Sequence, residues 1–483
     1  MDLPYRSAVK LAAAIRKRKV GCLELLDLYL DRVERHDTML NAVCVLDAER
    51  ARVRAAAADR ALARGKVWGP LHGVPMTIKE SFDVAGLPTT WGDPALKANV
   101  AAQDALAVER FKAAGVTLFG KTNVPLMLAD WQSFNAIYGT TNNPWDIARS
   151  PGGSSGGSAA ALAAGLTGIE AGSDIGASIR NPAHYCGVYG HKPTWGICSP
   201  RGQALPGRVS QADISVVGPM GRSAEDLAVG LDVMLGMDAV DGAGLQVRLP
   251  KPQRKKLKDF KVAVMLDDPN ARVDRQVQER LQALADFLRA SKAAVSYAAR
   301  PAIDTAEAQR VYIHLLRAAT SARQSDEQFA RNRDVAQKLD SADDSYYARM
   351  TRANVTPHRD WLAVNERRHQ MRLAWAAFFE EWDLLLCPAA SSAAFPHDQK
   401  GERHERTILV DGRKEPTTDQ LFWAGYSGCF YLPSTVAPCG FTREGLPVGV
   451  QIVGPQYGDL ACIAFAKLLE REWQAFVPPK GYD

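Results

Sequence analysis

Glycine and serine are concentrated between Pro144 and Lys192, and no other stretch constrains the fold and chemistry of the chain so strongly. It contains two segments that pair a serine with several glycines, Ser150-Pro-Gly-Gly-Ser-Ser-Gly-Gly-Ser158 and Gly172-Ser-Asp-Ile-Gly-Ala-Ser-Ile-Arg-Asn-Pro182. Charged residues and prolines interrupt it at single positions, so it is not a low-complexity linker. Small residues beside Ser178 let a ligand approach main-chain N–H groups, as a nucleophilic serine requires. Taken alone, each segment is equally compatible with a tight turn.

The first segment contains the pattern G-x-S-x-G, which is typical of the nucleophile elbow of α/β-hydrolases. That elbow needs an apolar strand directly before it, whereas here the preceding residues are Asn142-Asn-Pro-Trp-Asp-Ile-Ala-Arg149. A phosphate-binding loop would need a Gly-Lys-Ser/Thr ending or a Gly-x-Gly-x-x-Gly after a strand, and neither is present. The remaining simple interpretation is a flexible turn.

Elsewhere the periodicity of apolar residues predicts an α/β protein. A helix is expected over Cys22–His36, and a strand, a helix and a strand over Val74–Ile78, Asp104–Ala114 and Val116–Phe119, with Asp104 as helix cap. Further strands and helices are predicted in the following segments: strands at 260–266, 384–386, 435–437 and 448–453, and helices at 274–290, 303–381 and 460–472. A strand–helix–strand order favours a sheet with helices packed on it.

Length and composition exclude several classes of protein. A chain of 483 residues with 46% hydrophobic and 23% charged residues can bury a large core and is not disordered. A net charge of +5 is too small and too dispersed to predict a nucleic-acid or membrane partner. The eight cysteines show no CxxC or short-loop spacing, which indicates reduced thiols in the cytoplasm.

The N-terminal residues place their basic cluster after the short apolar stretch, the reverse of a secretory leader. No apolar run approaches the roughly 20 residues that a membrane-spanning helix needs. We therefore expect a cytoplasmic protein.

A third segment, Leu71-His-Gly-Val-Pro-Met-Thr-Ile-Lys79, ends an apolar run with a lysine. Lys79, Ser154 and Ser178 are separated by 75 and 24 residues, and with the two glycine–serine segments they closely resemble the amidase signature family. Supporting matches occur along the chain: Gly120-Lys-Thr-Asn-x-Pro125, Asn142-x-Pro-Trp-Asp146, Gly187-x-x-Gly-x-Lys-Pro193, Gly218-Pro-Met with Arg222, and Gly445-Leu-Pro-x-Gly-x-Gln451. The resemblance covers about 20 to 475 and is weakest between about 240 and 380.

The resemblance implies a metal-independent amidase with a Ser–cis-Ser–Lys triad and no cofactor. Ser178 would be the nucleophile, Ser154 the bridging serine in a cis peptide and Lys79 the base, which burial must make neutral. The oxyanion would be held by the backbone N–H groups of Ile175, Gly176, Ala177 and Ser178. Asp174 and Arg180 would fix the loop as structural support.

The sequence departs from the family at Ala177, where glycine is usual, and at Leu126, where an acidic residue is common. The latter predicts a more apolar wall near 126 to 131. Residues proposed to line the substrate pocket are Met127, Leu128, Asp130, Trp131, Trp423 and Tyr426, although core packing is an equal alternative for the C-terminal aromatic residues.

The expected fold is a single α/β domain over residues 1–483, with a central mixed β-sheet flanked by α-helices. It would comprise a helical part (1–65), the signature core (66–235), a variable helical part (236–380) and a C-terminal core part (381–483). The expected activity is hydrolysis of an amide, or of a related aryl-amide, ester or carbamate.

Two alternatives are the glutaminase subunit of a tRNA-dependent amidotransferase and a degenerate binding protein. We expect a small-molecule substrate and water, no nucleic acid and no membrane, and leave a homodimer open. The basic run Lys251–Lys258 is typical of a solvated surface rather than an RNA contact. His184, Cys186 and His191 are better explained by packing than by a metal.

Overall fold

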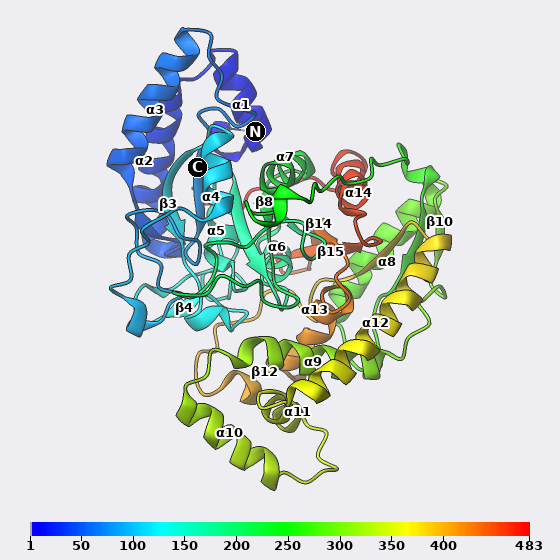
Figure 1. The fold of residues 1–483 in the computed structure, drawn as a ribbon. Coiled ribbons are helices and arrows are strands. Elements are labelled where there is room, and N and C mark those ends of the chain that lie inside the picture. The colour runs from blue at the N-terminus through cyan, green and yellow to red at the C-terminus, as the bar shows by residue number, and fades with distance from the viewer. Residues whose placement is uncertain (1) are drawn as a thin grey trace.

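Eight strands form the larger of two central sheets in this structure, a computed structural model that describes residues 2–483 (Figure 1). These strands are β6 (Glu170–Asp174), β7 (Tyr189–Lys192), β8 (Val216–Gly221), β9 (Lys261–Val264), β10 (Ala294–Ser296), β11 (Leu384–Pro388), β14 (Ser434–Phe441) and β15 (Pro447–Val453). Their order is β10-β9-β11-β15-β14-β7-β8-β6. β9 runs parallel to both of its neighbours and the other pairs are antiparallel. The prediction of a central mixed sheet is confirmed.

A second sheet has three strands, β1 (Val43–Leu46), β3 (Thr117–Thr122) and β2 (Pro75–Lys79), in the order β1-β3-β2. β2 and β3 are parallel and are connected through helix α4 (Leu106–Ala113), as the strand–helix–strand pattern predicts. A parallel bridge between Met76 and Ile169 joins this sheet to the chain entering β6. The strand that ends at Lys79 therefore lies beside the strand that leads to Ser178.

The predicted cap of α4 was wrong by one residue. Ala105 is the N-cap, and the carboxylate of Asp104 instead accepts hydrogen bonds from the backbone N–H of Ala85 at 2.9 Å and from Lys112 Nζ at 2.7 Å. The tertiary contact with the loop at Ala85 takes up the carboxylate that would otherwise cap the helix.

Helices cover the sheets on both sides and form an extension below them in Figure 1. The helices not yet given are α1 (Ala8–Arg16), α2 (Cys22–Leu40), α3 (Ala48–Ala63), α5 (Gly156–Ala163), α6 (Arg180–Cys186), α7 (Ala224–Met234), α8 (Arg275–Ala290), α9 (Thr305–Ser321), α10 (Asp326–Lys338), α11 (Tyr346–Ala353), α12 (His358–Glu381), α13 (Leu421–Gly428) and α14 (Asp459–Glu472). Two short hairpins complete the fold: β4 (Phe134–Asn135) with β5 (Gly139–Thr140), and β12 (Thr407–Val410) with β13 (Arg413–Pro416). The predicted helical region 303–381 corresponds to α9 to α12.

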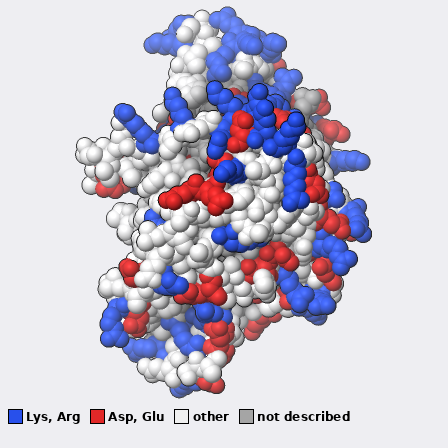
Figure 2. All heavy atoms as spheres, turned by 90° about the vertical axis from the view of Figure 1, so that its right-hand side faces the viewer, with Lys and Arg blue, Asp and Glu red and all other residues white. Residues whose placement is uncertain are grey.

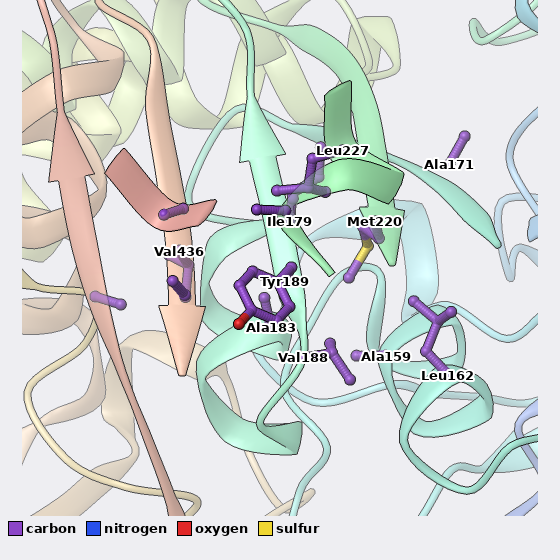
Figure 3. Close-up of a cluster of buried hydrophobic side chains, with 14 of the residues drawn as sticks. Ala159, Leu162, Ala171, Ile179, Ala183, Val188, Tyr189, Met220, Leu227 and Val436 are labelled. Atoms are coloured by element: carbon purple, nitrogen blue, oxygen red, sulfur yellow. The ribbon is translucent and has the colours of Figure 1, made fainter. Parts of the chain in front are cut away.

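The core beside the active-site loops is built from small residues. Every residue of α5 is buried, and its Ala159 and Leu162 belong to the same buried hydrophobic cluster as Ile179, Met220 and Leu227 (Figure 3). Because alanine side chains are short, this helix can lie close to its neighbours at the packing density of a protein interior. One cluster of buried hydrophobic side chains includes residues from Tyr5 to Tyr482.

Basic and acidic side chains both occur over the face shown in Figure 2. In the basic run, Arg254 is paired with Asp383 at 3.2 Å. Within residues 2–483, no helix is both long and apolar enough to cross a membrane.

Candidate active site

Lys79 is the last residue of β2 and has no exposed surface. Its Nζ donates hydrogen bonds to Ser154 Oγ at 2.7 Å, to Ser173 Oγ at 3.0 Å and to the Ser173 carbonyl at 3.3 Å. Burial lowers the pKa of Lys79 to about 7, although the negative charge of Asp174 opposes the shift. A substantial fraction of this lysine is therefore neutral at physiological pH and able to accept a proton.

Ser154 lies in the loop 150–155, before α5, and the Gly153–Ser154 peptide bond is cis. A Cβ on Gly153 would lie only 2.4 Å from the carbonyl oxygen of Asp130, so this turn accepts no larger residue. The loop is tied to the second serine loop by the backbone N–H of Ser155, which donates to the Ser178 carbonyl at 3.0 Å.

Ser154 and Ser178 line a cavity of about 210 Å³. We call it the larger cavity, because a second space beside Ser178 is smaller. Both serines are nearly buried, with 1% and 5% of their surface exposed. Among the hydrogen bonds of residues 2–483 none joins the two hydroxyl groups. The structure thus brings together the three predicted residues and shows one of the two contacts that a proton relay requires.

The backbone N–H groups of the Ser178 loop (175–179) are not equivalent. Ala177 N–H donates to Asp174 Oδ1 at 3.0 Å, and Ile179 N–H donates to Asp174 Oδ2 at 3.0 Å. Within residues 2–483, the N–H groups of Ile175, Gly176 and Ser178 have no acceptor. The Ala177 N–H, which the resemblance places among the oxyanion-binding groups, is thus engaged in shaping the loop in this structure. Ala177 also has a φ of 70°, a conformation that favours glycine.

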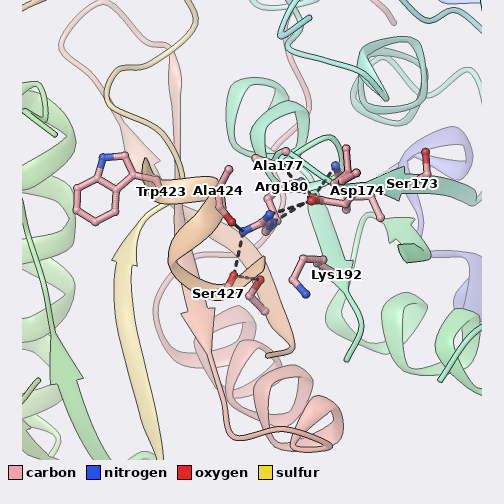
Figure 4. Close-up of polar contacts among 12 residues, drawn as sticks. Ser173, Asp174, Ala177, Arg180, Lys192, Trp423, Ala424 and Ser427 are labelled. Atoms are coloured by element: carbon pink, nitrogen blue, oxygen red, sulfur yellow. Dashed lines mark hydrogen bonds and ion pairs between the residues drawn. The ribbon is translucent and has the colours of Figure 1, made fainter. Parts of the chain in front are cut away.

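Asp174 and Arg180 form a buried bidentate ion pair, with Arg180 Nη2 2.8 Å from Asp174 Oδ1 and Nε 3.0 Å from Oδ2 (Figure 4). The other terminal nitrogen of Arg180, Nη1, is not part of the ion pair and donates to Gln451 Oε1, Ser427 Oγ and the Ala424 carbonyl. Burial alone would raise the pKa of Asp174, but the Arg180 guanidinium more than offsets this and holds that pKa below its usual range. The pair connects the Ser178 loop to α13 and β15.

The predicted substrate-pocket residues are only partly brought to the serines. Leu128, Asp130 and Trp131 line a second space of about 40 Å³ beside Gly176 and Ser178, which we call the smaller cavity. Met127 contributes its carbonyl oxygen, which accepts a hydrogen bond from Arg323 Nη1 at 3.0 Å.

Trp423 and Tyr426 line neither cavity, and of the two alternatives left open for them the structure favours core packing. Both are buried in the hydrophobic core on α13, where Tyr426 packs edge-on against Trp375 at 5.2 Å between ring centroids. The α13 segment is apolar all round, so helical periodicity could not show which side faces the site.

Several cavity residues were missed from the sequence. Ser173 accepts hydrogen bonds from both Lys79 and Gln203, the latter from Nε2 at 3.1 Å. Arg323 follows α9 and lines both cavities. Ser173 directly precedes Asp174 in the motif and could have been suspected, whereas Gln203 and Arg323 lie in segments without a sequence signal.

His184 and His191 are both satisfied by the protein. Gly449 N–H donates to His184 Nδ1 at 2.7 Å, and His184 Nε2 contacts the Ser392 carbonyl at 3.0 Å. His191 contacts Thr435 Oγ1 and Asp459 Oδ1. Within residues 2–483, no group of three His, Cys, Asp or Glu side chains is placed to hold a metal ion.

Known proteins are similar to this chain over nearly its whole length. The Amidase family model matches residues 24–463. Indoleacetamide hydrolase of Bradyrhizobium diazoefficiens is 34% identical over 475 residues, which are 96% of this chain and 86% of that protein. A glutamyl-tRNA(Gln) amidotransferase subunit of Thiobacillus denitrificans is 32% identical over a match that covers 99% of both chains.

Solved structures of known proteins have the same fold as this chain. A bacterial aryl acylamidase of the amidase signature family superposes with a TM-score of 0.82 at 24% identity, covering 97% of this chain and 96% of that one, and supports the fold. The family match and the relatives, which include an indoleacetamide hydrolase and an acylamidase, identify an amide-hydrolysing enzyme with an α/β fold. This chain belongs to the amidase family, as the signature residues predicted.

Proposed function

We propose that Ser178 attacks the carbonyl carbon of a carboxylic amide while Ser154 and Lys79 carry away its proton. The observation that supports this most directly is the 2.7 Å hydrogen bond between Lys79 Nζ and Ser154 Oγ in the cavity that Ser178 shares. A serine hydroxyl is a weak nucleophile and needs an adjacent base, and the lowered pKa of Lys79 makes a neutral amine available for that role.

The reaction has two steps. The proton of Ser178 moves through the Ser154 hydroxyl to Lys79 as the Ser178 Oγ–carbon bond forms. The same proton returns through Ser154 to the amine as the carbon–nitrogen bond breaks. Water then attacks the acyl-enzyme in the same manner and releases the carboxylic acid. The unpaired N–H groups of Ile175, Gly176 and Ser178 would hold the oxyanion in both steps.

Labelling with a fluorophosphonate tests the assignment of the nucleophile. The reagent should add one covalent mass to the peptide that carries Ser178 and none to the Ser178→Ala protein. Labelling at Ser154 or Ser155 would overturn the assignment.

The amidotransferase relatives favour a second candidate, a glutaminase that delivers ammonia within a complex. Glutamine hydrolysis by the isolated protein should be compared with hydrolysis of indoleacetamide, a neutral anilide, an ester and a carbamate. Activity restricted to glutamine would favour the second candidate over a free-standing amidase.

A further inference from the structure

Arginine side chains surround the space beside Ser178. Arg323 lines both cavities, Arg208 lines the larger one, and Arg317 and Arg403 line the smaller one. All four come from segments outside the two serine loops, and three of them belong to the chain between α9 and the residues that precede β12.

None of these four guanidinium groups is in an ion pair within residues 2–483. Their partners are neutral: the carbonyl oxygen of Met127 and the ring of Trp91, 5.3 Å away, for Arg323, and the Tyr346 hydroxyl for Arg317. Arg317 Nε is buried and has no acceptor in the described chain. The cavity walls therefore carry positive charge that the protein itself does not compensate.

Two carboxylates beside these walls are already in ion pairs with other arginines, although Oδ1 of Asp130 has no hydrogen-bond partner in the described chain. Asp130, which lines the smaller cavity, is paired with Arg406 at 2.6 Å. Glu109 is paired with Arg201, a residue of the larger cavity, at 2.8 Å.

The positive potential affects neighbouring groups. Burial lowers the pKa of Arg323 to about 10, and the charges of Arg208 and Arg317 contribute to that shift. Burial alone would raise the pKa of Tyr346, but Arg317 and Arg403 more than offset this and lower it. An unpaired buried charge is costly, and a bound anion would remove that cost.

We propose that the amide substrate of this enzyme carries a carboxylate, which Arg323 binds while Ser178 attacks the amide carbon. This rests on the proposed function of Ser178 and narrows its substrate class. A guanidinium holds a carboxylate through two parallel N–H···O bonds, which also fixes the orientation of the substrate. A substrate bearing an ammonium group next to the carboxylate, such as glutamine, would be disfavoured because Asp130, the acidic residue of the smaller cavity, is already neutralised by Arg406.

The experiment compares matched amides. Succinamate, glutaramate and adipamate carry a carboxylate, while butyramide, valeramide and hexanamide have the same chain lengths without it. At least one anionic amide should have a kcat/KM about tenfold or more above its neutral partner, with the difference mainly in KM. Glutamine should be poorer than glutaramate.

Arg323→Gln should lower kcat/KM for the preferred anionic amide about thirtyfold, as loss of a charge-assisted hydrogen bond does, while changing that of the neutral amide little. Arg201→Gln is the matched control, because it removes a guanidinium of the same cavity whose charge Glu109 already compensates. Equal losses on anionic and neutral amides would show that Arg323 only supports the fold and would overturn the proposal.

A binding measurement distinguishes the proposed carboxylate site from the proposed catalytic mechanism. Calorimetry on the Ser178→Ala protein should show tighter binding of the anionic amide than of its neutral partner, and addition of Arg323→Gln should abolish the difference. If wild-type protein hydrolyses no amide but this difference is seen, the mechanism fails and the anion site stands. If neutral amides are hydrolysed and bound as well as anionic ones, the anion site fails and the mechanism stands.

Discussion

Lys79 Nζ donates a 2.7 Å hydrogen bond to Ser154 Oγ, although the two residues are 75 positions apart and belong to different elements. β2, which ends at Lys79, lies beside the chain entering β6 through the bridge between Met76 and Ile169. The packing of β2 against β6 and of α5 against both strands, and not the local sequence, therefore places the amine beside the hydroxyl group of the loop before α5.

Replacing Ser178 with Ala should reduce kcat about a thousandfold, because an activated nucleophile is lost. Steady-state kinetics on the best amide of the panel measures the loss. Ser155→Ala is the matched control, since the Ser155 hydroxyl is buried with no hydrogen-bond partner in the described chain. The Ser155→Ala variant should keep nearly full activity. A large loss of activity in this variant would show that the catalytic role had been assigned to the wrong serine.

The pH dependence of kcat/KM should follow the protonation of Lys79. Its pKa is lowered to about 7, so the protonated, inactive form predominates below that pH and activity should rise towards a plateau on the alkaline side. A rate profile from acid to mildly alkaline pH measures the apparent pKa. A profile that is flat through neutral pH would contradict the role of the lysine as base.

Lys79→Arg should be nearly inactive, because guanidinium stays protonated at any useful pH. Circular dichroism should show that the variant is folded, and Lys79→Met provides an uncharged comparison of similar length. Retention of more than about a tenth of wild-type activity by the arginine variant would be incompatible with proton transfer to this position.

Ala177→Gly should stabilise the protein by about 1 kcal/mol, because Ala177 has a φ of 70°, which costs an L-residue more than glycine. Urea unfolding followed by fluorescence gives the free energy. The matched control is Ala160→Gly inside α5, which should destabilise by about 1 kcal/mol or more. A loss of stability in Ala177→Gly would show that the methyl group contributes more through packing than it costs in strain.

Glu170 is fully buried, and burial raises its pKa to about 8, with Thr77 Oγ1 donating a hydrogen bond to it. Because its pKa in the folded protein exceeds that in the unfolded chain, its contribution to stability is complete below about pH 4.5 and is lost as the pH rises to about 8. Glu170→Gln should therefore gain stability relative to wild type over this range. Urea midpoints of the two proteins measured across it should diverge, and parallel curves would contradict the raised pKa.

Much of the fold and the identity of the central residues could be predicted from the sequence. The strand–helix–strand unit and the helices after Asp274 follow from local periodicity, which depends on neighbours a few positions away. Lys79, Ser154 and Ser178 could be chosen because each lies in a segment whose residue types are unusual by themselves. The N-cap of α4 could not be predicted, because the backbone N–H of Ala85 in a neighbouring loop competes for the Asp104 carboxylate.

Only the tertiary structure decided which groups face the cavity. Nothing local distinguishes Trp423, which lies in the core, from Trp131, which lines the smaller cavity. Arg323 comes from the least family-like part of the chain and lines the cavities beside the serines, because the tertiary fold packs α9 against α13. The sequence therefore determined the chemical groups and their local conformations, whereas the charge and shape of the cavity depend on contacts between segments hundreds of residues apart.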